Sequence, residues 1–178
     1  MSKAAVTDSK RVWDPLVRVF HWSLVTCVLL NLFVVDDGEN LHQWLGYAAA
    51  ALVGVRAVWG FVGPRHARFV DFFPTPKRLV QHVQALRRGE VEHHWGHNPL
   101  GGLMALALMG MVLALGVTGW MQSLDAFWGV EWVQDLHEGL GEWLMPMVGI
   151  HAAAAIVMGR IERTRLVKAM VTGVKERY

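Results

Sequence analysis

The sequence predicts an all-α integral membrane protein, a bundle of four transmembrane helices with extra amphipathic helices at the membrane interface. Three observations predict this fold class. Hydrophobic residues make up 53% of the 178-residue chain, charged residues make up only 18%, and the mean hydropathy is positive. In a typical soluble domain, by contrast, about 25% of the residues are charged. Four apolar stretches also approach the roughly 20 residues that a helix needs to cross a bilayer. We expect a single membrane-embedded domain over residues 1–178.

Helix-start and helix-end signals bound the four predicted spans. Asp14-Pro15 can cap and begin the first span, and Asn98-Pro99 the third, because proline needs no amide donor at the first helical position. Gly63-Pro64 ends the second span, since glycine adopts the left-handed cap and proline prevents continuation. The fourth span starts near Asp135. The predicted spans are residues 15–35, 41–62, 99–121 and 135–160, with a long loop over residues 63–98.

Two further segments, residues 75–89 and 165–175, lie outside the spans and are amphipathic. In the second, Leu166 and Val174 share a predicted helix with Lys168 and Lys175 on the polar side. We expect both segments to form helices on the cytoplasmic membrane surface. A docking surface for a soluble partner is the alternative interpretation.

Basic residues are distributed unevenly along the chain. Lys and Arg occur before the first span, within residues 63–98 and after the fourth span, whereas the other two connections are acidic and contain neither. The positive-inside rule then places both termini and the long loop in the cytoplasm. We expect a multi-pass protein of the bacterial inner membrane whose basic clusters contact lipid headgroups. No base-reading motif accompanies these residues, so we expect no nucleic-acid partner.

Four histidines lie within the predicted spans. His137 and His151 are fourteen residues apart, which is just under four helical turns, so they share one face of the fourth span and are separated by roughly 21 Å. The topology places His42 beside His137 at the outer level and His21 beside His151 at the inner level. Imidazoles within hydrocarbon are costly and mostly functional.

Two imidazoles from different helices at one depth are the axial ligands that a six-coordinate haem iron requires. We therefore predict two b haems, an outer one held by His42 and His137 and an inner one held by His21 and His151. Haem c is disfavoured because the single Cys27 cannot form a C-x-x-C-H motif. Interhelical hydrogen bonding by each histidine is the simpler alternative. A proton or metal relay in a transporter is another class of function.

Three further residues bear on this site. Arg56 lies fourteen residues after His42, where it is expected either to pair with a haem propionate or to extend toward the cytoplasmic interface. His97, at the start of the third span, is a candidate contact for a propionate or a quinone headgroup. Pro146 is expected to kink the fourth span between its two histidines.

The remaining loop histidines are expected to be mostly solvated. His93 and His97 have the i,i+4 spacing of metal ligands, but Gly96 disfavours a helix between them, and no carboxylate or cysteine is expected to complete a site. The other three are His66, His82 and His94.

Four features of the chain stand out as motifs: the runs 12–22, 56–65 and 96–99 and the spacing from His137 to His151. They resemble those of the prokaryotic cytochrome b561 family, in the branch shared with nickel-hydrogenase b-type subunits. The resemblance covers nearly the whole chain and implies a four-helix dihaem cytochrome b with iron ligands His21, His42, His137 and His151. It also implies that the first and fourth helices share one haem and the second and fourth the other. Pro146 departs from the family pattern.

The function expected from these features is transmembrane electron transfer in a respiratory chain, between the quinone pool and a periplasmic redox partner such as a c-type cytochrome. The acidic outer loops would steer a basic partner, and ubiquinone binding is implied by analogy alone. No residue needs to act as a general base or nucleophile, so no catalytic residue is assigned. Whether the chain is a quinone-linked oxidoreductase stays open.

Two other functions are compatible with the same haems. One is a haem-carrying membrane anchor of a hydrogenase or dehydrogenase complex, and the other is oxidation of superoxide at the outer haem, which the resemblance suggests. The sequence leaves open whether the chain forms a homodimer or joins a larger membrane complex.

Overall fold

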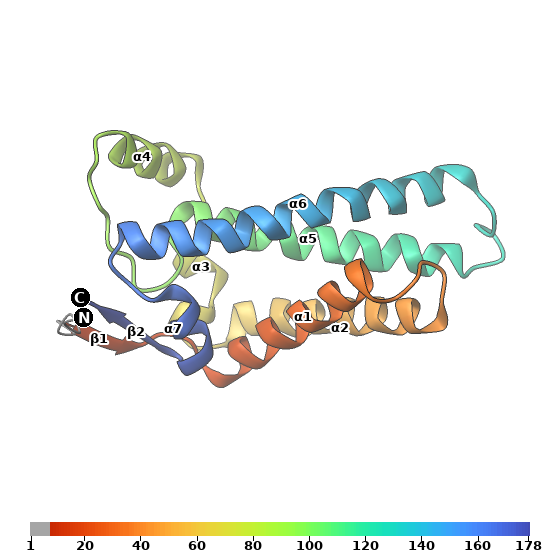
Figure 1. Ribbon diagram of the computed structural model, residues 1–178, viewed down its shortest axis with the longest axis horizontal. Coiled ribbons are helices and arrows are strands. Elements are labelled where there is room, and N and C mark those ends of the chain that lie inside the picture. Colours follow the sequence, from red (N-terminus) through yellow and green to blue (C-terminus); the bar gives the residue numbers. More distant parts are fainter. Residues whose placement is uncertain (1–7) are drawn as a thin grey trace. The chain divides into compact units, whose positions relative to one another are not determined.

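The computed structural model describes residues 8–178, and these residues form four long helices (Figure 1). Each helix is long and apolar enough to cross a membrane, which confirms the predicted fold class. Large hydrophobic residues of these helices such as Phe61 and Trp143 are 75% and 69% exposed, as expected of a surface that faces lipid. The helices are α1 (Pro15–Phe33), α2 (Asn40–Val62), α5 (Pro99–Gln122) and α6 (Glu131–Ile161).

Side-chain caps fix the beginnings of two of these helices. Oδ1 of Asp14 accepts a hydrogen bond from the backbone amide of Val17 at 3.1 Å, and Oδ1 of Asn98 accepts one from Gly101 at 2.7 Å. Both caps precede a proline, as predicted. α6 begins four residues before the predicted start and continues through Pro146 as one helix.

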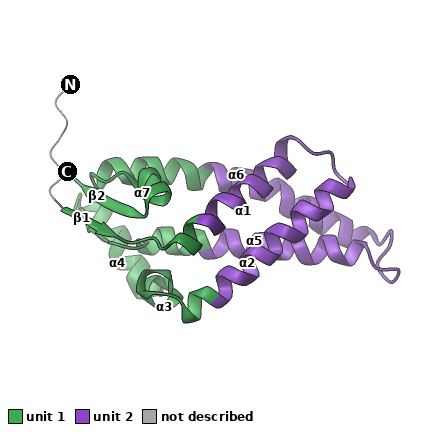
Figure 2. Ribbon diagram, turned by 90° about the horizontal axis from the view of Figure 1, so that it is seen from below, with its two compact units in different colours: residues 1–18, 59–105, 150–178 green, residues 19–58, 106–149 purple. Residues whose placement is uncertain are grey.

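The chain divides into two compact units (Figure 2). Unit 1 comprises residues 1–18, 59–105 and 150–178, and unit 2 comprises residues 19–58 and 106–149. Each long helix contributes residues to both units.

Unit 1 contains the short elements. A cluster of buried side chains, with Trp13, Ala67 and Ala169 among its members, forms its core. The strands β1 and β2 pair antiparallel, with Arg11 opposite Val174. The short elements are β1 (Asp8–Arg11), the 3₁₀ helix η1 (Arg65–Ala67), α3 (Phe69–Phe72), α4 (Pro76–Arg87), α7 (Leu166–Thr172) and β2 (Val174–Arg177).

The predicted amphipathic helix after Thr75 is confirmed as α4, and Thr75 caps it by accepting from the Arg78 amide. The prediction for the C-terminal segment is right for α7 but wrong for the residues that follow it. Gly173 ends α7 with a φ of +83°, and its carbonyl accepts from the Val12 and Trp13 amides. The chain then continues as a strand because β1 supplies backbone partners.

Lys175 is therefore not on the polar face of an interfacial helix. Its side chain is 2% exposed, and Nζ lies 3.1 Å from Oε2 of Glu162, which is 3% exposed. Asn98 donates to the other oxygen of Glu162 at 3.2 Å, and Nζ of Lys175 donates to the backbone carbonyl of His94 at 2.6 Å. Lys175 can be buried because its ammonium group is paired with a carboxylate and makes a further hydrogen bond.

In unit 2 the end of α1, the start of α2, the end of α5 and the start of α6 lie side by side (Figure 2). A methyl group at Gly116 of α5 would lie 2.7 Å from Cβ of Ala50 on α2. These helices approach each other so closely that only glycine fits at this position.

The charged residues of unit 2 are almost all acidic. Arg56 is the single basic residue of its sequence, against eight acidic ones. The acidic residues are Asp36, Asp37, Glu39, Asp125, Glu131, Asp135, Glu138 and Glu142.

Candidate functional site

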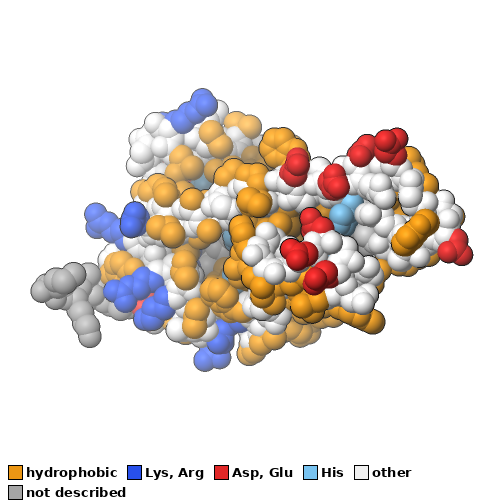
Figure 3. Space-filling model, turned by 45° about the vertical axis from the view of Figure 1, so that its right-hand side comes forward, with side chains coloured by type: hydrophobic (Ala, Val, Ile, Leu, Met, Phe, Trp, Pro, Cys, Tyr) orange, Lys and Arg blue, Asp and Glu red, His pale blue; other side chains and the backbone are white. Residues whose placement is uncertain are grey.

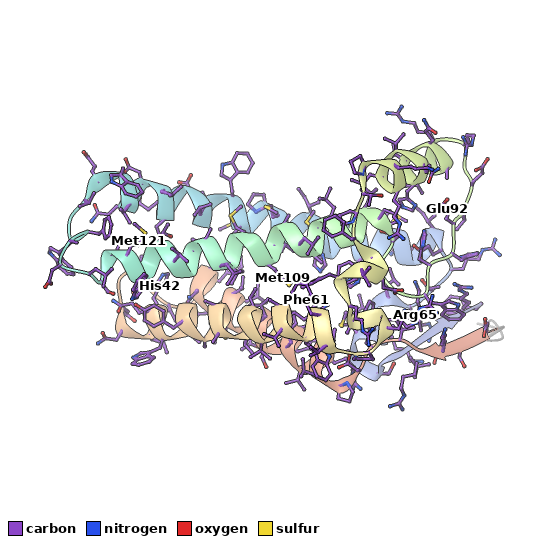
Figure 4. The ribbon with its side chains drawn as sticks, turned by 180° about the vertical axis from the view of Figure 1, so that it is seen from behind. His42, Phe61, Arg65, Glu92, Met109 and Met121 are labelled. Carbon is purple, nitrogen blue, oxygen red and sulfur yellow. The ribbon has the colours of Figure 1, made fainter. Side chains whose placement is uncertain are left out.

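Unit 2 brings together the two histidines that were predicted to form the outer pair. His42 lies at the start of α2 (Figure 4), and His137 lies near the start of α6. Their ring centres are 6.2 Å apart, and the ring planes are inclined at 67°.

A hydrogen-bonded chain on α5 orients the His137 ring. Nδ1 of His137 lies 2.8 Å from Oγ1 of Thr118, and this hydroxyl lies 2.9 Å from the backbone carbonyl of Ala114. A hydroxyl has one proton, and Thr118 donates it to the Ala114 carbonyl. The hydroxyl oxygen therefore accepts a hydrogen bond from the Nδ1–H group of His137. This tautomer leaves Nε2 of His137 with a free lone pair, the form in which a histidine binds a metal.

Gly119, the residue after Thr118, makes room for the same ring. A methyl group at this position would lie 3.2 Å from Cε1 of His137, closer than an unstrained carbon–carbon contact. Neighbouring positions on α5 therefore supply both the hydrogen bond and the space that fix His137.

His42 is held through its backbone and by a nearby carboxylate. Its carbonyl accepts a hydrogen bond from Nδ2 of Asn31 on α1 at 3.1 Å. Nδ1 of the ring lies 3.7 Å from Oδ1 of Asp37 and has no hydrogen-bond partner among the residues that the structure describes. The His42 ring thus retains unused ligand capacity.

Both histidines line a cavity of about 1030 Å³ in unit 2. Its volume lies at the upper end of the roughly 300–1,000 Å³ range of small-molecule and cofactor sites. Glycines including Gly46 and Gly141 contribute to its lining, and Asp37, Glu138 and Glu142 add carboxylates. Figure 3 shows a histidine side chain in a surface hollow bordered by acidic side chains.

The outer pair fits a haem iron. Two imidazoles that bind one metal ion with bonds of about 2 Å hold their ligating nitrogens roughly 4 Å apart and their ring centres roughly 6 Å apart. The observed 6.2 Å agrees with this spacing. The donor set, the tautomer of His137 and the volume of the cavity fit a haem that His42 and His137 would hold.

The other two predicted ligands lie in different units, so the structure does not test their pairing. His21 is on α1 in unit 2, where its ring packs edge to face against Trp22 with centres 5.1 Å apart. His151 is on α6 in unit 1 and is partly buried. Their assignment to an inner haem stays a prediction.

Arg56 is buried and His97 is partly buried. Arg56, on α2, is 3% exposed, which is unlike an arginine that extends into solvent. The His97 ring lies in unit 1 between Trp13 and Phe72, with both ring-centre distances at 4.7 Å. Their contacts with a propionate or a quinone stay predictions.

The expectation of solvated loop histidines is wrong for His82. This residue is on α4 and is 1% exposed, and its Nδ1 lies 2.8 Å from Oε2 of Glu92. With His94 these residues form a cluster that sequence reasoning missed. The helical period provided a signal, because His82 lies three residues after Leu79 and three before the buried Ala85 on one face of α4. Nothing in the sequence indicated Thr118, whose role depends on how α5 packs against α6.

Comparison with known proteins supports the same interpretation. The chain is 26% identical to a protein from Rhizobium leguminosarum bv. viciae named probable Ni/Fe-hydrogenase B-type cytochrome subunit, over an alignment that covers 96% of this chain and 90% of that protein. No solved structure matches the chain significantly. The family described as prokaryotic cytochrome b561 matches residues 12–173. Because this match extends over nearly the whole sequence, the chain belongs to the prokaryotic cytochrome b561 family and is a membrane b-type cytochrome of electron transport.

Proposed function

We propose that this cytochrome moves electrons across the bacterial inner membrane through two b haems, between the quinone pool and a periplasmic redox partner such as a c-type cytochrome. The observation that carries the proposal is the pairing of His42 with His137 over one cavity, with 6.2 Å between ring centres. Family membership supplies the broader statement, a membrane cytochrome with haem b.

The protein's own residues prepare the outer site. Thr118 accepts a hydrogen bond from Nδ1 of His137. Asn31 on α1 donates a hydrogen bond to the backbone carbonyl of His42 at the start of α2. Apolar side chains of the helices, among them Leu32, Val112 and Leu115, line part of the cavity. When bound, haem supplies reversible one-electron oxidation and reduction of its iron.

The spacing of histidines on α6 supports a second haem. His151 follows His137 by fourteen residues, which is roughly 21 Å along a helix. The hydrocarbon layer is about 30 Å thick. Two irons at these levels, with His21 and Arg56 at the inner one, would carry electrons over most of that distance.

The acidic residues of unit 2 support a basic periplasmic partner. Asp36 and Glu39 are exposed on the loop before α2, and no lysine and only one arginine belongs to the unit. Electrostatic complementarity of this kind mainly raises the rate of encounter.

A membrane-anchor role is the second candidate, and the relative's name favours it. That protein is a probable subunit of a Ni/Fe hydrogenase, so a soluble redox enzyme on the cytoplasmic or periplasmic side would replace one of the mobile electron carriers. Mild purification from native membranes separates the candidates: an anchor co-purifies with a redox enzyme in fixed stoichiometry, and a free-standing cytochrome does not.

Proteoliposomes test the leading candidate. The purified cytochrome is reconstituted with ubiquinol, and reduction of an external basic c-type cytochrome is followed optically. We expect transfer by the wild-type protein and by the control His93→Ala, which alters an exposed loop histidine, and loss of transfer in His42→Ala. Wild-type protein with intact haem spectra that ubiquinol does not reduce would contradict the proposal.

A further inference from the structure

Three potential metal ligands meet in unit 1, whereas His42 and His137 belong to unit 2. His82 lies on α4, and Glu92 and His94 lie on the loop after this helix, where Figure 4 labels Glu92. The ligand atoms of all three lie within 4.8 Å of one another. Oε2 of Glu92 is 2.8 Å from Nδ1 of His82 and 3.5 Å from Nε2 of His94.

The cluster is partly buried rather than a chance grouping on the surface. The His82 side chain is 1% exposed, and the side chains of His94 and Glu92 are 34% and 41% exposed. Nε2 of each histidine is buried and lacks a hydrogen-bond partner within residues 8–178. Buried polar atoms of native proteins are hydrogen-bonded in the large majority of cases, so Nε2 of His94, which faces Oε2 of Glu92 at 3.5 Å, has ligand capacity left for an ion.

Neighbouring contacts hold the loop in place. Lys175 donates to the backbone carbonyl of His94 at 2.6 Å, and the guanidinium of Arg177 lies 4.0 Å from the centre of the Trp95 ring. The rings of His82 and His94 pack edge to face with centres 5.6 Å apart. The ligands are therefore positioned by interactions that do not involve an ion.

The donor set is suited to a transition metal. Two imidazoles with one glutamate are a known three-ligand set for Zn²⁺, whereas Mg²⁺ and Ca²⁺ prefer oxygen ligands. With bonds of about 2.0–2.1 Å, ligand atoms of a tetrahedral site lie roughly 3.3 Å apart. The 3.5 Å distance between His94 and Glu92 is close to this value. Because Glu92 is partly exposed, its carboxylate can move outward and lengthen the 2.8 Å distance to His82.

The geometry points to a binding site for one divalent transition-metal ion, best matched by Zn²⁺, formed by His82, Glu92 and His94. The fourth position is left to water. The site is separate from the histidines assigned to haem, and it links α4 to the loop that leads to α5. Its chemical effect is to add a metal cross-link to the existing contact between His82 on α4 and Glu92 on the loop after it.

Zinc content at buffered free Zn²⁺ tests the site. The haem-loaded full chain, purified through a tag without histidine, is stripped with a chelator, dialysed against a series of zinc buffers and measured by mass spectrometry. We expect one zinc per chain. Glu92→Gln and His94→Ala should weaken binding at least about 100-fold, since even the loss of an outer-shell partner costs 10–100-fold.

His93→Ala is the matched control, because it removes an exposed imidazole next to His94 and should leave the affinity unchanged. Haem spectra and melting temperatures confirm that each variant is folded, and X-ray absorption at the zinc edge should show two imidazoles. Absence of zinc from the wild-type protein, or equal zinc uptake by all four proteins, would overturn the inference.

Discussion

Thr118 and His137 are joined by a hydrogen bond of 2.8 Å between Oγ1 and Nδ1, although nineteen residues separate them and they lie on different helices. The bond determines which ring nitrogen of His137 keeps its proton, and so which nitrogen is available to an iron. A threonine in the last turns of an apolar helix would thereby become part of the proposed haem site.

Replacing Thr118 with valine should weaken the outer haem without unfolding the protein. Valine keeps the shape of the side chain but removes the acceptor for the Nδ1 proton, and loss of such outer-shell partners typically costs 10–100-fold in metal affinity. Haem retention during dilution and the midpoint potential of the outer haem measure the effect.

Thr26→Val is the control for this substitution. Thr26 is on α1, and its hydroxyl donates to the Trp22 carbonyl at an exposed position. Equal haem loss from both variants would show that the Thr118 bond has no special role.

A larger side chain at Gly119 should displace the His137 ring. Because a Cβ there would already lie 3.2 Å from Cε1 of His137, Gly119→Val is expected to remove one haem per chain. Gly110→Val, on the same helix but with no atom within 4 Å of the added Cβ, should retain both. The haem-to-protein ratio is the measurement, and an unchanged ratio in Gly119→Val would contradict this packing.

The buried ion pair between Lys175 and Glu162 should be sensitive to loss of one partner. Lys175→Met leaves the Glu162 carboxylate unpaired in a buried site, which costs about 3–5 kcal/mol of stability. Adding Glu162→Gln should restore most of this loss. Thermal unfolding in detergent, followed by circular dichroism, ranks the variants.

Lys168→Met provides the comparison for this pair. Lys168 lies 2.8 Å from Glu176, but its side chain is 44% exposed, and exposed pairs contribute only about 0–1 kcal/mol. A larger effect at Lys168 than at Lys175 would contradict the ranking by burial.

Neutralising the loop before α2 should slow electron transfer to a basic partner. With Asp36→Asn and Glu39→Gln combined, we expect a lower rate of c-type cytochrome reduction at low salt, and rates that converge with wild type as salt screens the charges. Glu90→Gln, an exposed residue of the loop 63–98, is the control. A salt-independent wild-type rate would contradict electrostatic steering.

Local signals made most of the fold predictable. The long helices follow from apolar length, and Asp14 and Asn98 cap them through contacts three residues away. The pairing of Arg11 with Val174 could not be predicted, because it joins distant segments and the strands are polar four-residue stretches without an alternating pattern. Burial of Lys175 and Glu162 depends on that same distant pairing.

The candidate site was predictable in part for similar reasons. His42 and His137 could be placed at one depth because spans and topology follow from hydropathy and charge. The orienting role of Thr118 depends on the rotation of α5 against α6, which hydropathy does not specify. His82 was misjudged because its partner Glu92 lies beyond a turn, ten residues along the chain.

The haem-to-chain ratio of the purified protein tests the central claim most directly. Pyridine haemochrome spectra against protein mass should give two b haems per wild-type chain, one in His137→Ala and two in the control His93→Ala. A wild-type ratio of one, or loss of both haems from a folded His137→Ala protein, would contradict the assignment of two histidine-ligated haems.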